Sequence, residues 1–306
     1  MLNNGVALTQ QGDTSMEREL WTIISKHLTL LARTMREDNF VHSTARILRV
    51  YLWSVLNDRP VYWACDRRNW RGVKPPRYLP NQSTMSRRLY RDTTQQMLMK
   101  LLDQLEPVQH NELTLRMDGK SLPVAKHSGD KQATIGRGTG GFQKGYKLHT
   151  IYGKGNRPVK WCVKPMNVDE RRVAAQFLAE QDLGEGYLLA DGNYETNPLY
   201  DQASEVGRML VTPRRFRKAK GLGQSRKHSE HRVAMIERMK APSPFIREVL
   251  KTRPQVETRY ANLCNFGGGL TCLPPWVRSR RVEPYVRAKI LIRLTRDQVI
   301  QRKDAA

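Results

Sequence analysis

The sequence predicts an α/β fold in which a mixed five-stranded sheet with flanking helices follows a helical N-terminal domain. Up to residue 110 the apolar residues recur at the spacing of amphipathic helices. Beyond that point short strand-like runs alternate with helical segments, in the order strand, strand, strand, helix, strand, helix, strand. Such an order is typical of one sheet with helices packed on it. We therefore expect one domain over residues 1–110 and a second over residues 111–306.

Helices account for the predicted N-terminal domain. They are expected to begin near Glu17 and after Asn39, and two more are expected at residues 80–91 and 93–105.

The segment 80–91 has the features of a DNA recognition helix. Polar residues open it, small hydroxyl residues fill its first turn and arginines follow. Helix-turn-helix proteins insert the first turns of such a helix into the major groove. We expect Arg87, Arg88 and Arg91 to contact DNA; the alternative is an ordinary surface helix with a basic face.

Five strands are expected in the second domain, at residues 113–118, 145–152, 158–163, 187–190 and 208–211. In the first of them Leu113, Leu115 and Met117 alternate with polar residues, the pattern of a half-buried strand. Glycines between the second and third strands predict a hairpin. Residues 127–142, rich in Gly and Thr, are expected to form a loop. Helices are expected after Asn167, from Asn197, around residues 253–263 and over residues 282–299. The arrangement is that of the RNase H-like fold.

The charge of the chain indicates a polyanionic partner. The formal net charge is +24 and the isoelectric point is about 10.3, which favours nucleic acid. A basic insertion is expected at about residues 212–245, where Lys and Arg far outnumber acidic residues. We expect its cations to follow DNA phosphates, the alternative being a solvated loop. The residues concerned are Arg214, Arg215, Arg217, Lys218 and Lys220.

Several classes of protein are excluded at this point. No apolar run approaches the ~18 residues of a membrane helix, and the N-terminus lacks the pattern of a signal peptide. The four cysteines are scattered without zinc-ligand spacing, so reduced thiols in a cytoplasmic protein are expected.

Three carboxylates stand where they could act together. Asp118 and Asp191 each follow an apolar strand, and Glu257 lies in a predicted helix. Each Asp-Gly pair alone could be simple turn chemistry. However, a buried carboxylate is costly unless it is paired or binds a metal, and oxygen ligands without His or Cys favour Mg²⁺ or Mn²⁺. Glu237 and Glu248 are other candidates for the third acid.

These segments resemble the DDE-type transposases of bacterial insertion sequences over roughly residues 110–295. The matching motifs are Leu-Arg-Met-Asp118-Gly-Lys, Leu-Leu-Ala-Asp191-Gly-Asn-Tyr and Arg253-x-x-x-Glu257. The resemblance implies that Asp118, Asp191 and Glu257 are the catalytic ligands of two Mg²⁺ or Mn²⁺ ions. It also implies that Arg253 contacts phosphate or orients Glu257. The chain departs from the family pattern at Leu250 and Cys264, where Tyr and Lys are common.

The function that this resemblance implies is DNA transposition. The protein would bind the terminal inverted repeats of an insertion sequence and catalyse metal-dependent cleavage and transfer to target DNA, as a homodimer in the synaptic complex. A cytoplasmic, nucleoid-associated bacterial protein is expected. Two alternatives are a non-catalytic DNA-binding protein of transposase origin and an RNase H-like nuclease without strand transfer.

Overall fold

The computed structural model describes residues 10–35, 40–109, 112–138, 140–180, 182–213, 227–264 and 269–304. The chain divides into two compact units. Unit 1 comprises residues 1–107, 265–270 and 283–306, and unit 2 comprises residues 108–264 and 271–282. The C-terminal helix therefore groups with the N-terminal helices, whereas the sequence suggested a single boundary near residue 110.

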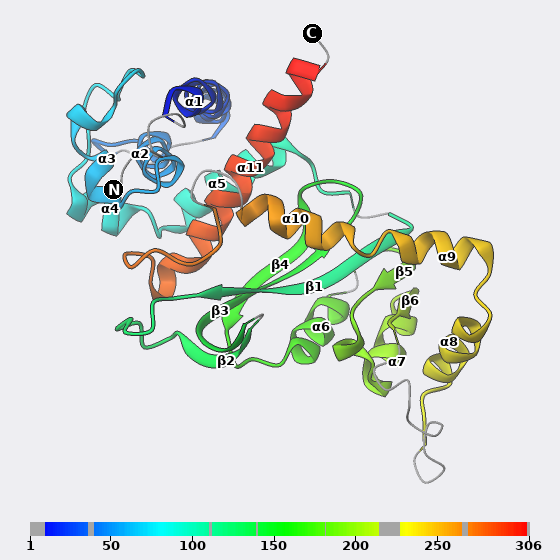
Figure 1. The fold of residues 1–306 in the computed structure, drawn as a ribbon. Helices are drawn as coiled ribbons and strands as arrows, with labels where there is room; N and C mark the ends of the chain where they lie inside the picture. Colours follow the sequence, from blue (N-terminus) through cyan, green and yellow to red (C-terminus); the bar gives the residue numbers. More distant parts are fainter. Residues whose placement is uncertain are drawn as a thin grey trace, which may run out of the picture. The chain divides into compact units, whose positions relative to one another are not determined.

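Unit 1 is helical. Its elements are α1 (Gln10–Thr34), α2 (Thr44–Leu56), α3 (Val61–Ala64), the 3₁₀ turn η1 (Arg67–Asn69), α4 (Gln82–Arg88), α5 (Asp92–Leu105) and most of α11 (Val282–Asp304) (Figure 1). The first helix begins earlier than the sequence suggested. The second is capped by Ser43, whose side chain accepts a hydrogen bond from the Arg46 N–H. Asn39, the cap expected from the sequence, lies outside the described residues. The segment 80–91 contains only the seven-residue helix α4, because Arg91 already caps α5.

Tryptophans and an ion pair between α11 and the end of α2 help to hold unit 1 together. The rings of Trp21, Trp53 and Trp70 lie 5.1 to 5.5 Å apart, centroid to centroid. In α11 the nearly buried Lys289 pairs with Asp58 at 2.5 Å, directly after α2. A buried cation requires such a partner, and this contact explains why the C-terminal helix belongs to unit 1.

Unit 2 contains one mixed sheet. Its strands are β1 (Thr114–Pro123), β2 (Thr134–Gly138), β3 (Gly141–Tyr152), β4 (Pro158–Pro165), β5 (Gly186–Leu189) and β6 (Arg208–Val211). They lie in the order β2-β3-β1-β5-β6, with β4 also paired to β3. β1 pairs antiparallel with β3 and parallel with β5. The expected β3–β4 hairpin is confirmed.

The sheet has six strands, one more than predicted. Part of the segment 127–142, expected to be a loop, is β2, which pairs antiparallel with the start of β3. Its glycines interrupt the alternation of apolar and polar residues, so the sequence did not predict this strand. A Cβ on Gly136 would lie 2.4 Å from the Met166 carbonyl oxygen, so close packing requires Gly there.

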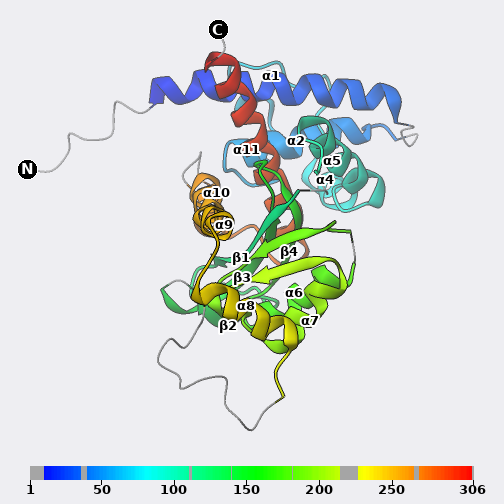
Figure 2. The ribbon, with the colours of Figure 1, turned by 90° about the vertical axis from the view of Figure 1, so that its right-hand side faces the viewer.

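Helices cover both faces of the sheet (Figures 1 and 2). α6 (Glu170–Ala179) and α7 (Asn197–Glu205) lie on one face, where Val173 and Phe177 pack in a cluster with Leu115 and Met117 of β1. α10 (Gln255–Cys264) crosses the other face. α8 (Glu230–Lys240) and α9 (Pro244–Lys251) precede it. In the described part of the chain no helix has both the length and the apolar character needed to cross a bilayer.

Candidate active site

Asp118, inside β1, and Asp191, just after β5, lie on neighbouring strands. β1 and β5 run parallel, and the last residues that pair are Arg116 and Leu189. Asp118 and Asp191 each stand two residues further on. Side chains alternate between the faces of a strand, so a step of two keeps the register and the face. The sheet thus brings together two carboxylates that are far apart in the sequence.

The Asp118 carboxyl has a raised pKa. Burial is the main reason why its pKa rises to about 6. The negative charges of Asp191 and Glu170 raise this pKa further. The Gly119 N–H, 2.8 Å from Asp118 Oδ1, and the positive charge of Arg253 act in the opposite direction. The negative charges beside the Asp118 carboxyl fit a divalent cation, which both aspartates would bind and which would relieve the repulsion.

Two hydrogen bonds fix α10 and the turn before it to β1. The buried Arg116 donates from Nε to the Thr252 carbonyl at 2.9 Å, which holds that turn. The Tyr260 hydroxyl donates to the main-chain carbonyl of Asp118 at 2.8 Å. Thr150 Oγ1 lies 2.6 Å from the same phenol oxygen. A phenol has one proton, so Thr150 is the donor in this second contact.

Glu257 lies in the first turn of α10, three residues before Tyr260. Residues three apart share a face of a helix. Arg259 secures the helix further by donating to the Gly155 carbonyl at 2.8 Å. The Glu257 side chain is exposed and has no hydrogen-bond or ion-pair partner among the described residues. Nor do three His, Cys, Asp or Glu side chains in that part of the chain form a ready metal-binding group. The structure therefore joins the two aspartates, and Glu257 stands on the helix anchored next to them.

An ion pair between α6 and β3 lies next to the site, on the face of the sheet opposite α10. Glu170, the first residue of α6, binds Lys147 of β3 at 2.5 Å. A Cβ on Gly119 would lie 3.2 Å from Lys147 Cδ and 3.3 Å from Glu170 Cδ. The pair thus presses against the residue that follows Asp118. This pair was not among the residues predicted from the sequence. The N-cap of α6 is Asp169, which accepts a hydrogen bond from the Arg171 N–H.

The arginines predicted to contact DNA differ in exposure. Arg87 and Arg91 are exposed. Arg88 is 5% exposed, donates to the His42 carbonyl at 3.0 Å and stacks on Phe40 at 3.8 Å. Its guanidinium supports unit 1 and is not presented to a phosphate, so the sequence prediction for Arg88 is corrected.

The other predicted DNA contacts fall elsewhere. Arg253 is half-buried in the turn between α9 and α10, and its charge acts on Asp118. The remaining predicted cations lie outside the described residues; they are Arg214, Arg215, Arg217, Lys218 and Lys220.

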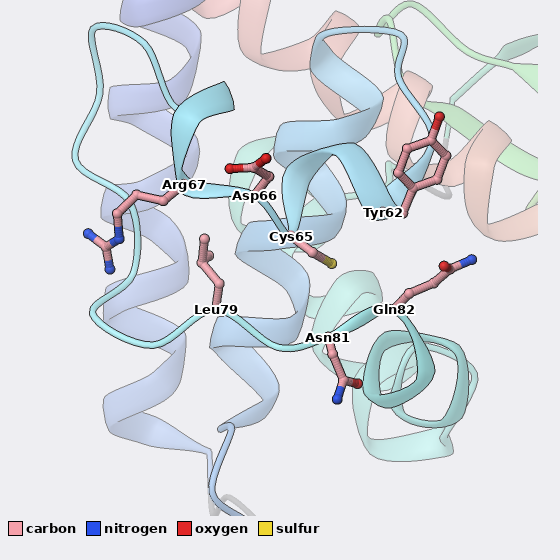
Figure 3. Close-up of a pocket in the computed structure, with 7 residues that line it drawn as sticks. All are labelled: Tyr62, Cys65, Asp66, Arg67, Leu79, Asn81 and Gln82. Atoms are coloured by element: carbon pink, nitrogen blue, oxygen red, sulfur yellow. The ribbon is translucent and has the colours of Figure 1, made fainter.

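A hollow of about 560 Å³ lies beside the start of α4 in unit 1. Figure 3 shows its lining residues, which are Tyr62, Cys65, Asp66, Arg67, Leu79, Asn81 and Gln82. Its polar groups already serve the fold, since Asn81 Oδ1 accepts from the Thr84 N–H at 2.8 Å and Asp66 binds Arg68 at 2.6 Å. The hollow holds no catalytic arrangement comparable to that of the two aspartates.

The comparison with protein families agrees with this geometry. The family model for the transposase DDE domain matches residues 110–281, which is more than half of the chain. The matched range holds all six strands, both aspartates and Glu257. No curated protein and no solved structure gives a significant match.

Proposed function

Because the chain belongs to the transposase DDE domain family, we propose that it cuts DNA at the ends of a mobile element and joins those ends to target DNA. The observation that carries this proposal is the parallel register that makes Asp118 and Asp191 neighbours. The anchoring of α10 beside Asp118 by Tyr260 supports Glu257 as the third carboxylate.

Asp118, Asp191 and Glu257 are the proposed ligands of two Mg²⁺ or Mn²⁺ ions. When bound, two such ions activate a water or a 3′-hydroxyl and stabilise the leaving oxygen of a phosphodiester. Asp118 and Asp191 supply adjacent oxygen ligands from the sheet. Glu257 is exposed, so its side chain can turn towards the aspartates without breaking another contact.

Other residues of the chain bind and orient DNA in this proposal. Arg253 lies close enough to Asp118 for its charge to act on that carboxyl, and it would hold a phosphate beside the aspartates. Arg87 and Arg91 of unit 1 are exposed cations for the terminal inverted repeats. The cations of residues 214–220 add non-specific attraction to the same polyanion. A homodimer would bring two ends together in the nucleoid of a bacterial cytoplasm.

The proposal is tested with DNA that carries the ends of the element. Wild-type protein and the variants Asp118→Asn, Asp191→Asn and Glu257→Gln are incubated with Mg²⁺, Mn²⁺ or EDTA. We expect metal-dependent cleavage and end joining by the wild type and a loss of at least roughly a thousandfold in each variant, because removal of one ligand weakens metal binding and transition-state stabilisation together. Circular dichroism and DNA binding should stay unchanged.

The products separate the proposal from its alternatives. Cleavage without joined products would identify a nuclease that uses the same carboxylates. DNA binding without cleavage in the presence of either metal ion would identify a DNA-binding protein without catalytic activity. Full activity of Glu257→Gln would remove Glu257 from the site and leave the two aspartates to be completed by another acid.

A further inference from the structure

Two loops of unit 2 form a basic surface away from the carboxylates. We call this the 278–281 patch; it consists of Trp276, Arg278, Ser279, Arg280 and Arg281 with residues 126–132 beside them. The patch borders an open hollow of about 740 Å³ lined by Gln132, Pro275, Trp276 and residues 278–281. The arginines at 278, 280 and 281 are exposed, and Trp276 is half-buried.

A buried carboxylate fixes the geometry of the patch. Asp130 is only 2% exposed. It accepts hydrogen bonds from the Ser279 N–H at 2.9 Å, the Ser279 hydroxyl at 2.8 Å and the Tyr146 hydroxyl at 2.7 Å. Ser279 has a φ of 51°, the left-handed region that residues other than Gly rarely adopt. Such a conformation persists only where its surroundings impose it, and here Asp130 does so.

The two loops are joined at further points. The Leu273 N–H donates to the Pro123 carbonyl at 2.8 Å, and a Cβ on Gly129 would lie 3.6 Å from Arg278 Nη1. Arg278 Nε donates to the Pro275 carbonyl at 2.6 Å. The last two contacts hold the Arg278 side chain in place without neutralising it, because a carbonyl carries no net charge.

The charge of the patch is of one sign. Residues 124–133 and 271–282 contain five cations, Lys126, Lys131, Arg278, Arg280 and Arg281, and Asp130 is their single acid. Asp130 is buried, so the exposed charges of these two loops are cations. Three exposed guanidinium groups on a loop that Asp130 holds through Ser279 suit phosphate oxygens.

The position of the patch relates it to the candidate active site. The Pro123 carbonyl that holds Leu273 ends β1, five residues beyond Asp118. Five residues of strand span about 17 Å, which is roughly five base pairs of duplex at about 3.4 Å each. The point at which the loop of the patch is fixed to β1 therefore stands about half a helical turn of duplex from Asp118.

We propose that the 278–281 patch binds the phosphate backbone of the DNA duplex that is cut at Asp118, with Arg278, Arg280 and Arg281 as the contacts. This inference rests on the proposed function for the identity of the duplex. It assigns an interaction surface to residues outside both the carboxylate site and the predicted recognition helix. The contacts carry no base specificity, because phosphates are the same in every sequence.

The test compares the removal of three positive charges from the patch with the removal of three positive charges elsewhere on unit 2. The triple variant Arg278→Ala, Arg280→Ala, Arg281→Ala is matched by a control, Arg137→Ala, Arg172→Ala, Arg247→Ala, whose three arginines are exposed on β2, α6 and α9. Binding of a fluorescein-labelled duplex is measured by anisotropy in EDTA over a range of salt concentrations. We expect the slope of log K against log salt to fall by about 3 in the patch variant, since each phosphate contact contributes about 0.9.

The control should lose less than about one unit of slope, because scattered charges make no defined contacts. A Lys triple at the patch should keep most of the slope, since the charges remain. Equal slopes for the patch variant and the control, or no change in either, would overturn the inference. The proposed function is judged separately by cleavage: wild-type protein that binds through the patch but never cuts DNA would refute the function and leave the surface standing.

Discussion

The Tyr260 hydroxyl donates a 2.8 Å hydrogen bond to the main-chain carbonyl of Asp118. This bond joins residues that are 142 positions apart, and it does so at the residue most important to the proposed chemistry. Thr150, opposite Asp118 on β3, completes the link by donating to the same phenol. Tyr260 therefore links the strand that carries Asp118 directly to the helix that carries Glu257.

Replacement of Tyr260 by Phe should loosen this link. The Asp118 carbonyl and the buried Thr150 hydroxyl would lose a partner, which costs roughly 1–3 kcal/mol when a polar group is left unsatisfied. We expect a corresponding fall in the free energy of unfolding and a larger fall in cleavage rate, since Glu257 would be less well placed. Urea denaturation and end-cleavage assays measure the two effects.

Tyr187→Phe is the matched control for this variant. Tyr187 packs on Phe245 with ring centroids 5.5 Å apart, and no hydrogen bond of its hydroxyl is seen among the described residues. Removal of the Tyr187 hydroxyl should change the free energy of unfolding by less than about 0.5 kcal/mol. Equal effects of both substitutions on cleavage would show that the Tyr260 bond does not position the site.

Breaking the Lys147–Glu170 ion pair should lower the stability of the fold more than breaking an exposed ion pair of similar length. Its 2.5 Å distance resembles the 2.6 Å of the Lys251–Glu248 pair, but its side chains are 10% and 19% exposed against 70% and 69%. Glu170→Gln should cost roughly 2 kcal/mol because Lys147 is left poorly solvated. Glu248→Gln should cost less than about 1 kcal/mol, as exposed pairs do.

A double-mutant cycle separates the pair from its surroundings. Lys147→Met combined with Glu170→Gln should recover part of the stability that Glu170→Gln alone loses, because the unpaired cation is gone. Urea denaturation of the four proteins gives the coupling. A coupling energy no larger than that expected for an exposed pair would mean that the contact between Lys147 and Glu170 adds little to the stability of the fold.

The sequence predicted five of the six strands because their apolar residues follow strand periodicity. β2 was missed, since its glycines serve close packing and leave no apolar pattern. The buried polar groups were also missed. The burial of Lys289 and the stacking of Arg88 on Phe40 depend on partners far along the chain. Composition shows that such residues are charged, but it cannot show that they are buried.

The carboxylates illustrate the same limit at the candidate site. Asp118 and Asp191 could be named because each ends an apolar run. That they are neighbours depends on the pairing of β1 with β5, and sequence periodicity does not fix which strands pair. Glu170 could not be found at all. Its place at the start of α6 has an ordinary helix signal, and its contact with Gly119 exists only in the folded chain.

Asp118 should destabilise the metal-free protein at neutral pH. Its pKa in the fold is about 6, against an ordinary value of 3.8. Between these values the folded state binds more protons than the unfolded state, so the stability contributed by this group falls as pH rises from about 4 to about 6 and is flat above that. Asp118→Asn should therefore be more stable than the wild type at pH 7, by at most about 3 kcal/mol.

Urea denaturation of both proteins in EDTA from pH 3.5 to pH 8 measures this difference. The two should have similar stability at the acid end, and added Mg²⁺ should favour the wild type because only the carboxylate pair binds it tightly. A difference that does not vary with pH would mean that the Asp118 carboxyl keeps its ordinary pKa in the fold.

Arg253 should set the pH at which the site accepts metal. Its charge lowers the pKa of Asp118, and a carboxylate must be ionised to serve as a ligand. Replacement by Gln should therefore raise the pKa of Asp118 above about 6 and move the midpoint of Mn²⁺ affinity to higher pH. The loss of affinity should be larger at pH 6 than at pH 8. Arg253→Lys keeps the charge and should stay close to the wild type. Calorimetric titration with Mn²⁺ across this range decides the matter: an equal loss at every pH would assign Arg253 to packing of the turn before α10 and not to the electrostatics of Asp118.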